Sequence, residues 1–421
     1  MKKLIRLLLV FSMVMAMIGC NSGEKPAITE EEIEIADFDY SRYQVYPVES
    51  HKANSGRPYT DDNLPIFTRK MILELLGDEE NQVFSPFNLY LNLNLMAGLT
   101  SGEARKEILD LLGKEEDTLL KDYQALWKAY YADDGKRVSE YANSIWLNEN
   151  LDVNDDKLKQ IADDYFVPGF RGDMGSKDYT RAFQSWMNDN TGKMMGKQIS
   201  GLEFDPGTLM AVASTIYYSN RWQYEYDPLK TKDATFHGVN GDTKAPFMNK
   251  TCSGFYVEGN GFSGIMDMFG NGEGYMLFLM PDEGGSIRNV FESEDFLKLI
   301  DGSRDELLIP CYLDVSLPKF DVDSKFKIEE ILPRLGVRSM FDAGSNAFAE
   351  LSSTPMEVDK IEHACRLILD EEGVKAAAYT VDIMYGGGPT ERRKVVFDRP
   401  FIFMIMPDMK NVMFCGVINQ L

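Results

Sequence analysis

Histidine is scarce in this chain of 421 residues, which contains only His51, His237 and His363. Three familiar enzyme signatures are missing as well: the GxSxG elbow of serine hydrolases, the HExxH zinc motif and a glycine-rich phosphate loop. A hydrolase that relies on histidine therefore has few residues from which to build its site. We expect a protein that is not an enzyme and that needs no cofactor.

Basic residues are also in deficit, because 44 lysines and arginines stand against 67 aspartates and glutamates. The resulting net charge of −23 repels nucleic acid and anionic lipid. We therefore expect no nucleic-acid partner. Apolar residues still make up 44% of the chain, which is enough for a large globular core.

Cysteine is sparse and widely spaced, which argues against a disulfide framework. Beyond Cys20 the chain has four cysteines, and no two of them form a CxxC pair. Three lie in apolar, strand-like runs, so core thiols are favoured over disulfides, and we expect no bound metal. The four are Cys252, Cys311, Cys365 and Cys415.

Residues 1–20 have the layout of an export signal, with Lys2 and Lys3 ahead of a mostly apolar run that is short for a spanning helix. The run closes on Met17-Ile18-Gly19-Cys20, which resembles a bacterial lipobox with methionine in place of the usual leucine. The resemblance implies an exported lipoprotein, acylated on Cys20 and anchored by lipid to the outer membrane or cell surface, on its extracellular or periplasmic face. The alternative is a free cysteine in an ordinary secretory signal.

The rest of the chain divides into a short acidic stretch and one large domain. Residues 21–50 are rich in glutamate and poor in core residues, so we expect a flexible tether there, with an ordinary solvated stretch as the alternative. No tandem repeat and no Pro/Gly/Ser-rich linker divides residues 51–421, which predicts a single domain.

The order of the predicted elements indicates an α+β fold. Apolar residues recur at every third or fourth position in five segments, which predicts helices. These segments are residues 64–76, 87–99, 103–112, 118–131 and 178–195. Strand-like runs then dominate, and the last two form a buried hairpin. These runs are residues 138–147, 208–218, 275–280, 307–317, 363–369, 395–406 and 412–418. Helices first and strands later, with little alternation, are typical of α+β.

One long connection stands out, residues 371–394, because connections of about two dozen residues inside a compact domain are usually functional or disordered. Its second half contains the flexible run Gly386-Gly387-Gly388-Pro389. Its first half alternates like a buried strand and is a candidate two-state element, the alternative being an alanine-rich helical turn before a glycine loop. The face with small or apolar residues consists of Val374, Ala376, Ala378 and Thr380.

The start of this connection resembles the hinge of the serpin family. The family's Glu-(Glu/Lys)-Gly-Thr-Glu-Ala-Ala-Ala is matched here by Glu371-Glu372-Gly373-Val374-Lys375-Ala376-Ala377-Ala378. Seven further short motifs follow the family's order, so the resemblance covers about residues 55–421. They are Val83-Phe84-Ser85-Pro86, Trp186 with Asn190-Thr191-Gly192-Lys193, Asn220-Arg221-Trp222, Leu279-Met280-Pro281-Asp282, Leu317-Pro318-Lys319-Phe320, Gly336-Val337 with Met340-Phe341-Asp342, and Phe397-Asp398-Arg399-Pro400-Phe401.

The resemblance implies the serpin fold: a helical N-terminal part, a large central β-sheet, two further sheets and an exposed reactive-centre loop, in a monomer. It also implies a suicide-type protease inhibitor. A serine protease, or a papain-like cysteine protease, cuts the loop, forms an acyl-enzyme, and is carried away when the hinge inserts into the central sheet. A non-inhibitory member that acts as a cell-surface binding protein is the alternative.

The family's spacing implies a reactive bond at Gly387–Gly388, since Gly387 is the 17th residue counted from Glu371 inclusive. These positions suit an elastase-like or papain-like target. Arg392 and Arg393 would suit a trypsin-like protease but are expected to lie too near the following strand. Alternative positions for the reactive bond are Met384, Tyr385 and Pro389.

The resemblance further implies residues that control opening of the sheet. His363 is expected beneath the opening sheet, hydrogen-bonded around Ser85 and Ser214, with a core histidine satisfied by one backbone carbonyl as the alternative. Lys319 is expected to pair with Glu371 where the hinge enters the sheet, unless the two form a solvated pair of little value. The residues assigned to this control are His363, Ser85, Ser214, Trp222 and Lys319.

Overall fold

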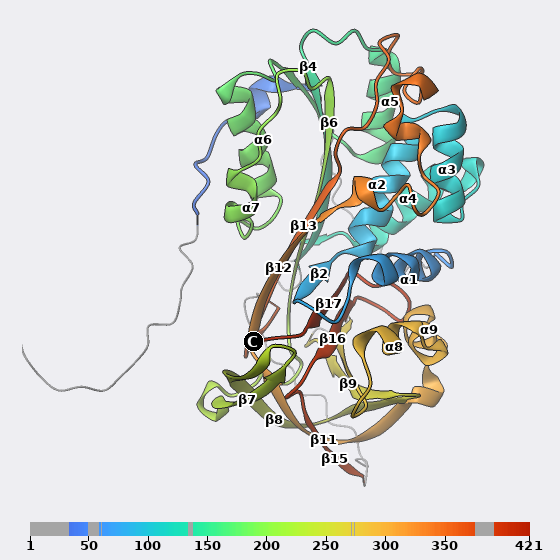
Figure 1. The fold of residues 1–421 in the computed structure, drawn as a ribbon. Helices are drawn as coiled ribbons and strands as arrows, with labels where there is room; N and C mark the ends of the chain where they lie inside the picture. Colours follow the sequence, from blue (N-terminus) through green and yellow to red (C-terminus); the bar gives the residue numbers. More distant parts are fainter. Residues whose placement is uncertain are drawn as a thin grey trace, which may run out of the picture.

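The computed structural model describes residues 33–48, 59, 61–133, 138–270, 272, 274–374 and 391–421 (Figure 1). The expected signal over residues 1–20, its lipidated Cys20 and residues 375–390 of the predicted loop lie outside the described residues. Within the described part of the chain, no helix has the length and apolar character needed to cross a membrane.

An eight-stranded sheet runs along the molecule (Figure 1). Its order is β1-β5-β4-β6-β14-β13-β12, with β3 paired to β4. The strands are β1 (Gln44–Tyr46), β3 (Ala132–Asp133), β4 (Val138–Asn148), β5 (Gly169–Gly172), β6 (Met210–Arg221), β12 (Phe320–Lys327), β13 (Glu362–Leu369) and β14 (Gly373–Val374). We call this the large sheet.

A second sheet has nine strands in the order β15-β11-β8-β9-β10-β16-β17-β2, with β7 paired to β8. The long β8 pairs with β11 and β7 along one part and with β9 at its end, so it joins the two further sheets expected from the sequence into one hydrogen-bonded unit. The strands are β2 (Gln82–Phe84), β7 (Lys232–Gly238), β8 (Gly241–Gly259), β9 (Phe262–Met268), β10 (Tyr275–Pro281), β11 (Leu308–Pro318), β15 (Arg392–Val396), β16 (Phe401–Met406) and β17 (Phe414–Ile418).

Helices cover both faces of the large sheet, with α2 to α5 on one side and α6 and α7 on the other (Figure 1). The helices are α1 (Leu64–Leu75), α2 (Pro86–Leu99), α3 (Gly102–Leu112), α4 (Glu116–Tyr130), α5 (Asp155–Tyr165), α6 (Lys177–Asp189), α7 (Gly196–Ser200), α8 (Ile287–Glu292) and α9 (Glu294–Asp301). Short 3-10 turns are η1 (Ser41–Tyr43), η2 (Pro228–Lys230), η3 (Asp305–Leu307), η4 (Ile328–Glu330), η5 (Ser339–Phe341) and η6 (Ala343–Ser345).

The α+β fold is confirmed, and the predicted segments correspond to α1 to α4, α6, β4, β6, β10, β11, β13, β15, β16 and β17. The other helices and strands, among them the long β8, were not predicted. Two predicted elements were too long. The helix expected over residues 178–195 ends at Asp189, because Gly192 and Lys193 take left-handed φ angles of 57° and 60° that no helix can contain. The strand expected over residues 395–406 is two strands, β15 and β16, separated by residues 397–400, of which Pro400 has no amide proton for a ladder.

The N-terminal segment differs from the flexible tether predicted over residues 21–50. Residues 44–46 form β1, which adds an antiparallel edge strand to β5. The side chains of Phe38, Tyr40 and Tyr43 pack on an aromatic cluster that includes Trp146. The prediction weighed the acidic residues and overlooked these three aromatic rings, which supply the buried area that holds residues 33–48 on the domain.

Candidate functional site

The hinge begins as a strand within the large sheet. Gly373 and Val374 form β14, which pairs with β6 on one side and β13 on the other. The side chain of Val374 is only 4% exposed. Gly373 has a φ of +147°, and a Cβ at that position would lie 2.3 Å from the carbonyl oxygen of Asn220, so only glycine fits. The last two described residues of the hinge, Gly373 and Val374, are therefore already part of the sheet.

Beyond β14 the two flanking strands are not joined. Among the described residues, no backbone pairing links β6 to β13; each pairs on its outer side, with β4 and β12 respectively. The edge of a strand is a template on which a further strand can pair. In the described part of the sheet, β14 is therefore the link between β6 and β13, and we call the end of the sheet where it lies the entrance.

Polar contacts fix the turn that leads into β14. The Lys319 ammonium lies 2.6 Å from Glu371 Oε2, which is the pair expected from the sequence, and Thr231 Oγ1 donates to Glu371 Oε1 at 2.8 Å. Arg221 Nη2 lies 3.3 Å from Glu372 Oε2. Burial works to raise the pKa of Glu371, but the hydrogen bonds from Lys319 and Thr231 outweigh it and lower that pKa. Glu371 is therefore a carboxylate at neutral pH.

Trp222 holds the same turn from the other side. Its indole Nε1 donates to Asp370 O at 3.1 Å, and its backbone N–H donates to Glu372 O at 3.2 Å. The N–H of Tyr226 donates to Glu371 O at 3.0 Å. The sequence pointed to Trp222 and Lys319 through the family resemblance, but it missed Thr231 and Tyr226. Both lie about 140 residues before their partner Glu371 in the sequence, and no local sequence pattern predicts contacts over such a separation.

Replacing Glu371 with lysine tests what this turn contributes. Glu371→Lys places a second cation beside Lys319 and removes the acceptor used by Thr231. Because Lys319 is 37% exposed, solvent screens the lost pair, and we expect a fall of about 1–2 kcal/mol in the free energy of unfolding. Urea unfolding measures this, and Glu371→Gln is the size-matched control. A loss that does not shrink at high salt would contradict the ionic part of the explanation.

His363 lies in β13 and is 6% exposed. Its Nε2 accepts a hydrogen bond from the backbone N–H of Ser85 at 3.1 Å and lies 3.3 Å from Cys365 Sγ. Its main partner is therefore a backbone donor on the first turn of α2, not the carbonyl of the alternative hypothesis. An accepting Nε2 places the ring proton of the neutral form on Nδ1.

Ser214 joins this group indirectly. Ser214 Oγ lies 2.6 Å from Asn88 Oδ1, and the N–H of Asn88 donates to Ser85 Oγ at 3.1 Å. Hydrogen bonds thus run from β13 through the start of α2 to β6. Strands β13 and β6 are the two that flank β14. His363, Ser85 and Ser214 are brought together as expected, with Asn88 as the bridge, although Ser214 does not touch His363. Their control of sheet opening stays a prediction.

The buried imidazole predicts a pH dependence of stability. Burial lowers the pKa of His363 from its ordinary 6.5 to about 4. The unfolded chain therefore binds a proton before the folded one as pH falls. The associated stability is complete above pH 6.5, declines between 6.5 and 4, and changes no further below 4. From pH 7 to pH 5 the loss is about 2 kcal/mol.

Urea unfolding of the wild type and of His363→Gln at pH 7 and pH 5 measures this loss. The variant side chain stays neutral, so the wild type should lose about 2 kcal/mol more than the variant. An equal loss in both proteins would assign the acid sensitivity to other groups.

Most of the predicted reactive loop lies outside the described residues. Lys375, Ala376, Ala377 and Ala378 of the hinge and the reactive-bond candidates lie outside the described residues and stay predictions. The candidates are Met384, Tyr385, Gly387, Gly388 and Pro389. The described residues after the loop begin at Glu391, and Arg392 and Arg393 are the first residues of β15. The guanidinium of Arg392 donates two hydrogen bonds to the carboxylate of Asp314 in β11, from Nε to Oδ2 at 2.6 Å and from Nη2 to Oδ1 at 2.7 Å.

The thiols match their prediction, since all four described cysteines are free, three of them buried and Cys252 partly so. Within the described ranges, no group of three or more His, Cys, Asp or Glu side chains is placed to hold a metal ion.

Comparison with known proteins agrees with this geometry. A family model described as Serpin (serine protease inhibitor) matches residues 66–421. A serine protease inhibitor of Cyanea capillata is 26% identical over 360 residues, which are 81% of this chain and 93% of that protein.

Two solved structures share the fold. The native state of the thermophilic serpin tengpin superimposes with a TM-score of 0.76 at 24% identity and covers 91% of this chain and 99% of its own. Human thyroxine-binding globulin superimposes with a TM-score of 0.73 at 18% identity and covers 85% of this chain and 96% of its own. At these identities the likeness concerns the fold alone.

Proposed function

The chain belongs to the serpin family, and from this premise we propose that it is a suicide-type protease inhibitor whose loop inserts between β6 and β13. Serpins are mostly suicide inhibitors and not catalytic enzymes. The observation that carries the proposal is the position of Val374, buried between two strands that are not otherwise paired in the described part of the sheet. If the residues after Val374 continued as a strand, they would extend β14 between β6 and β13.

The register of β14 predicts which residues of β6 and β13 each following loop residue would face after insertion. Val374 is opposite Asn220 on β6 and Leu369 on β13. Counting on in that antiparallel register, Thr380 would meet Ser214 and His363. The same count puts Ala376 against the buried Tyr218 and Leu367, and Ala378 against the buried Cys365 and the partly buried Ile216. Small side chains on this face are what a packed sheet interior can accept.

The chemical step belongs to the protease. Its serine hydroxyl or cysteine thiol attacks the carbonyl carbon of the reactive bond, the C–N bond breaks, and the nucleophile's proton passes to the departing amine. The loop is left as an ester or thioester on the protease. The fragment after the cut stays attached because β15, β16 and β17 belong to the nine-stranded sheet. Insertion of about 15 residues at roughly 3.3 Å each then moves the protease about 50 Å.

We assign an elastase-like or papain-like target, because the candidate positions carry glycine, methionine, tyrosine or proline and none carries a basic side chain. The two arginines that would suit a trypsin-like protease lie within β15, where Arg392 is fixed by Asp314. A peptide bond in a strand is a poor protease substrate compared with one in an exposed loop.

The test is to incubate the protein without residues 1–20, which keeps β1 and the docked segment, with a panel of proteases and look for a complex that survives SDS. The same reactions run with a protease whose nucleophile is blocked give the control. Mass spectrometry of the released fragment identifies the reactive bond. Cleavage without capture by any member of the panel would favour a non-inhibitory binding protein instead, and cleavage only after Arg392 or Arg393 would refute the target class.

We also propose that the inhibitor is displayed at the membrane through lipid on Cys20. The support is the lipobox-like Met17-Ile18-Gly19-Cys20 after a short apolar run. Expression of the full chain in bacteria with labelled palmitate should label the wild type and leave Cys20→Ser unlabelled and released from the membrane. Label on both proteins would remove the lipoprotein assignment without touching the inhibitor proposal.

A further inference from the structure

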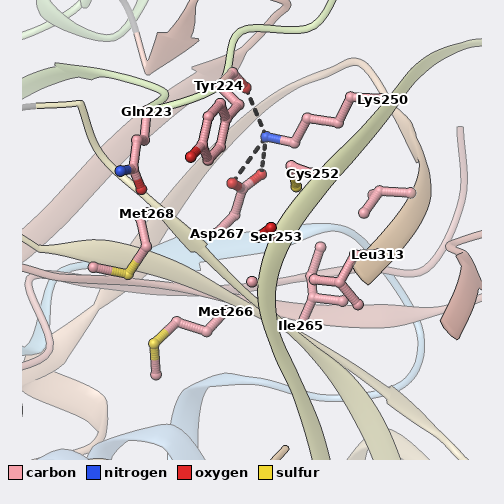
Figure 2. A pocket seen from close by; sticks show the side chains of 12 residues that line it. Gln223, Tyr224, Lys250, Cys252, Ser253, Ile265, Met266, Asp267, Met268 and Leu313 are labelled. Carbon is pink, nitrogen blue, oxygen red and sulfur yellow. Dashed lines mark hydrogen bonds and ion pairs between the residues drawn. The ribbon is translucent and has the colours of Figure 1, made fainter. Parts of the chain in front are cut away.

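A buried ion pair joins β8 and β9 of the nine-stranded sheet (Figure 2). Lys250 of β8 and Asp267 of β9 have side chains that are 5% and 6% exposed. The ammonium lies 2.8 and 2.7 Å from the two carboxylate oxygens of Asp267 and donates to the carbonyl oxygen of Tyr224 at 2.9 Å. All three ammonium protons thus have acceptors.

Aromatic residues complete the shell around the pair. The hydroxyl of Tyr226 donates to Asp267 Oδ2 at 3.1 Å. The ammonium also stands 4.1 Å from the centre of the Tyr226 ring and 5.2 Å from that of Trp222. A cation over two ring faces gains further stabilisation in a desolvated place. The carbonyl oxygen, the hydroxyl and the two rings named here as contacts of the pair all belong to residues 222–226, which we call the bracing segment.

The bracing segment has a second set of contacts on its other side. The N–H groups of Trp222 and Tyr226 and the indole of Trp222 donate to the backbone of residues 370–372, as described above. One short segment therefore joins the ion pair to the turn from which β14 starts. The position of that turn depends on where the pair holds the segment.

Stability alone does not explain a buried pair of this kind. Replacing such a pair with apolar residues of similar size is often neutral or stabilising, because desolvation cancels the attraction of the charges. What a fully hydrogen-bonded pair does supply is a defined geometry, since only one arrangement satisfies all its partners. The pair contacts the bracing segment, and the bracing segment is hydrogen-bonded to the turn just before β14, the two-residue strand that insertion would extend.

We propose that the Lys250–Asp267 pair is a positioning element for loop insertion. It fixes the bracing segment, and the bracing segment fixes the turn at residues 370–372, so that β14 is formed and in register before the loop is cut. Insertion then extends an existing strand and does not have to nucleate one. This inference rests on the proposed inhibitory function.

The decisive variant is the double substitution Lys250→Met/Asp267→Leu, which removes both charges and leaves neither unpaired. We expect its urea midpoint to stay near that of the wild type. Amide exchange over residues 222–226 of the intact protein, read by mass spectrometry, should become about tenfold faster. With a captured protease, about fivefold more inhibitor should be cleaved for each complex formed, because slower insertion leaves time for hydrolysis of the acyl-enzyme.

Two further variants keep the result interpretable. Tyr226→Phe leaves the pair intact and removes only the hydroxyl that binds Asp267, so it should show the same two effects in smaller measure. Lys114→Met removes another buried cation, one that pairs with Asp61 and Asp122 in the helical part of the molecule. It should lower the urea midpoint while leaving exchange in the bracing segment at the wild-type rate.

Unchanged exchange over residues 222–226 in the double variant would overturn the inference, and so would an equal acceleration in Lys114→Met. Faster exchange with an unchanged ratio of cleaved inhibitor to complex would overturn it too. A wild type that captures no protease is a different result, because it removes the inhibitory function itself.

Discussion

Cutting the loop of the purified domain within residues 375–390 is expected to raise its thermal midpoint by about 10 °C or more. Insertion adds a strand between β6 and β13, whose facing edges are not paired with each other in the described structure. About a dozen new backbone hydrogen bonds at roughly 0.5–1.5 kcal/mol each amount to on the order of 10 kcal/mol. Divided by an unfolding entropy of about 2 cal/mol/K per residue, that gives a rise of this size.

Differential scanning calorimetry of the intact and nicked domain measures the rise. Protein treated with an inactivated protease is the control, and gel analysis confirms that both fragments stay together after the cut. A nicked domain that melts at or below the intact midpoint would mean that no strand is added, and the inhibitor proposal would fall with the fold unaffected.

Val374→Arg is expected to turn the inhibitor into a substrate. Val374 is 4% exposed in β14, so arginine there introduces a charge with no partner into the interior of the sheet. A buried, uncompensated charge costs about 3–5 kcal/mol, which corresponds to a factor of about 100 or more in the rate of a step that must bury it. The loop would still be cut, but hydrolysis of the acyl-enzyme would precede insertion.

The matched control is Val374→Thr, which restores the residue that the family usually has at this position and keeps a small, uncharged side chain. SDS-stable complex should disappear in the arginine variant and persist in the threonine variant, while cleavage of the loop continues in both. The thermal midpoint of nicked Val374→Arg should also stay near that of the intact variant. Persistent complex with Val374→Arg would show that capture does not need β14.

Local sequence patterns located about half of the described helices and strands, and their ends less well. The helix ending at Asp189 and the break between β15 and β16 depend on left-handed residues and a proline, signals that were visible in the sequence but were outweighed by apolar periodicity. The docked N-terminal segment was missed for another reason. Its aromatic rings become core residues only because β5 and α6 present an aromatic cluster to them.

The candidate site shows a similar division. The family resemblance pointed to Lys319 with Glu371 and to His363 near Ser85, and both contacts are present. It did not point to Asn88 as the bridge to Ser214, nor to the Lys250–Asp267 pair. Buried polar networks join residues from several elements, and no periodicity relates one partner to another.

The sequence by itself determined the α+β class, the hinge with its small residues and Gly373, and the absence of common enzyme motifs. The class and the missing motifs follow from residue type and spacing along the chain, and the hinge follows from the resemblance to the serpin family. Only the tertiary structure decided that Val374 is already part of the large sheet, that β6 and β13 do not pair with each other in its described part, and that a buried ion pair contacts the bracing segment. Such facts arise when distant segments pack together, because burial and hydrogen-bond partners are properties of the assembled interior and not of any single segment.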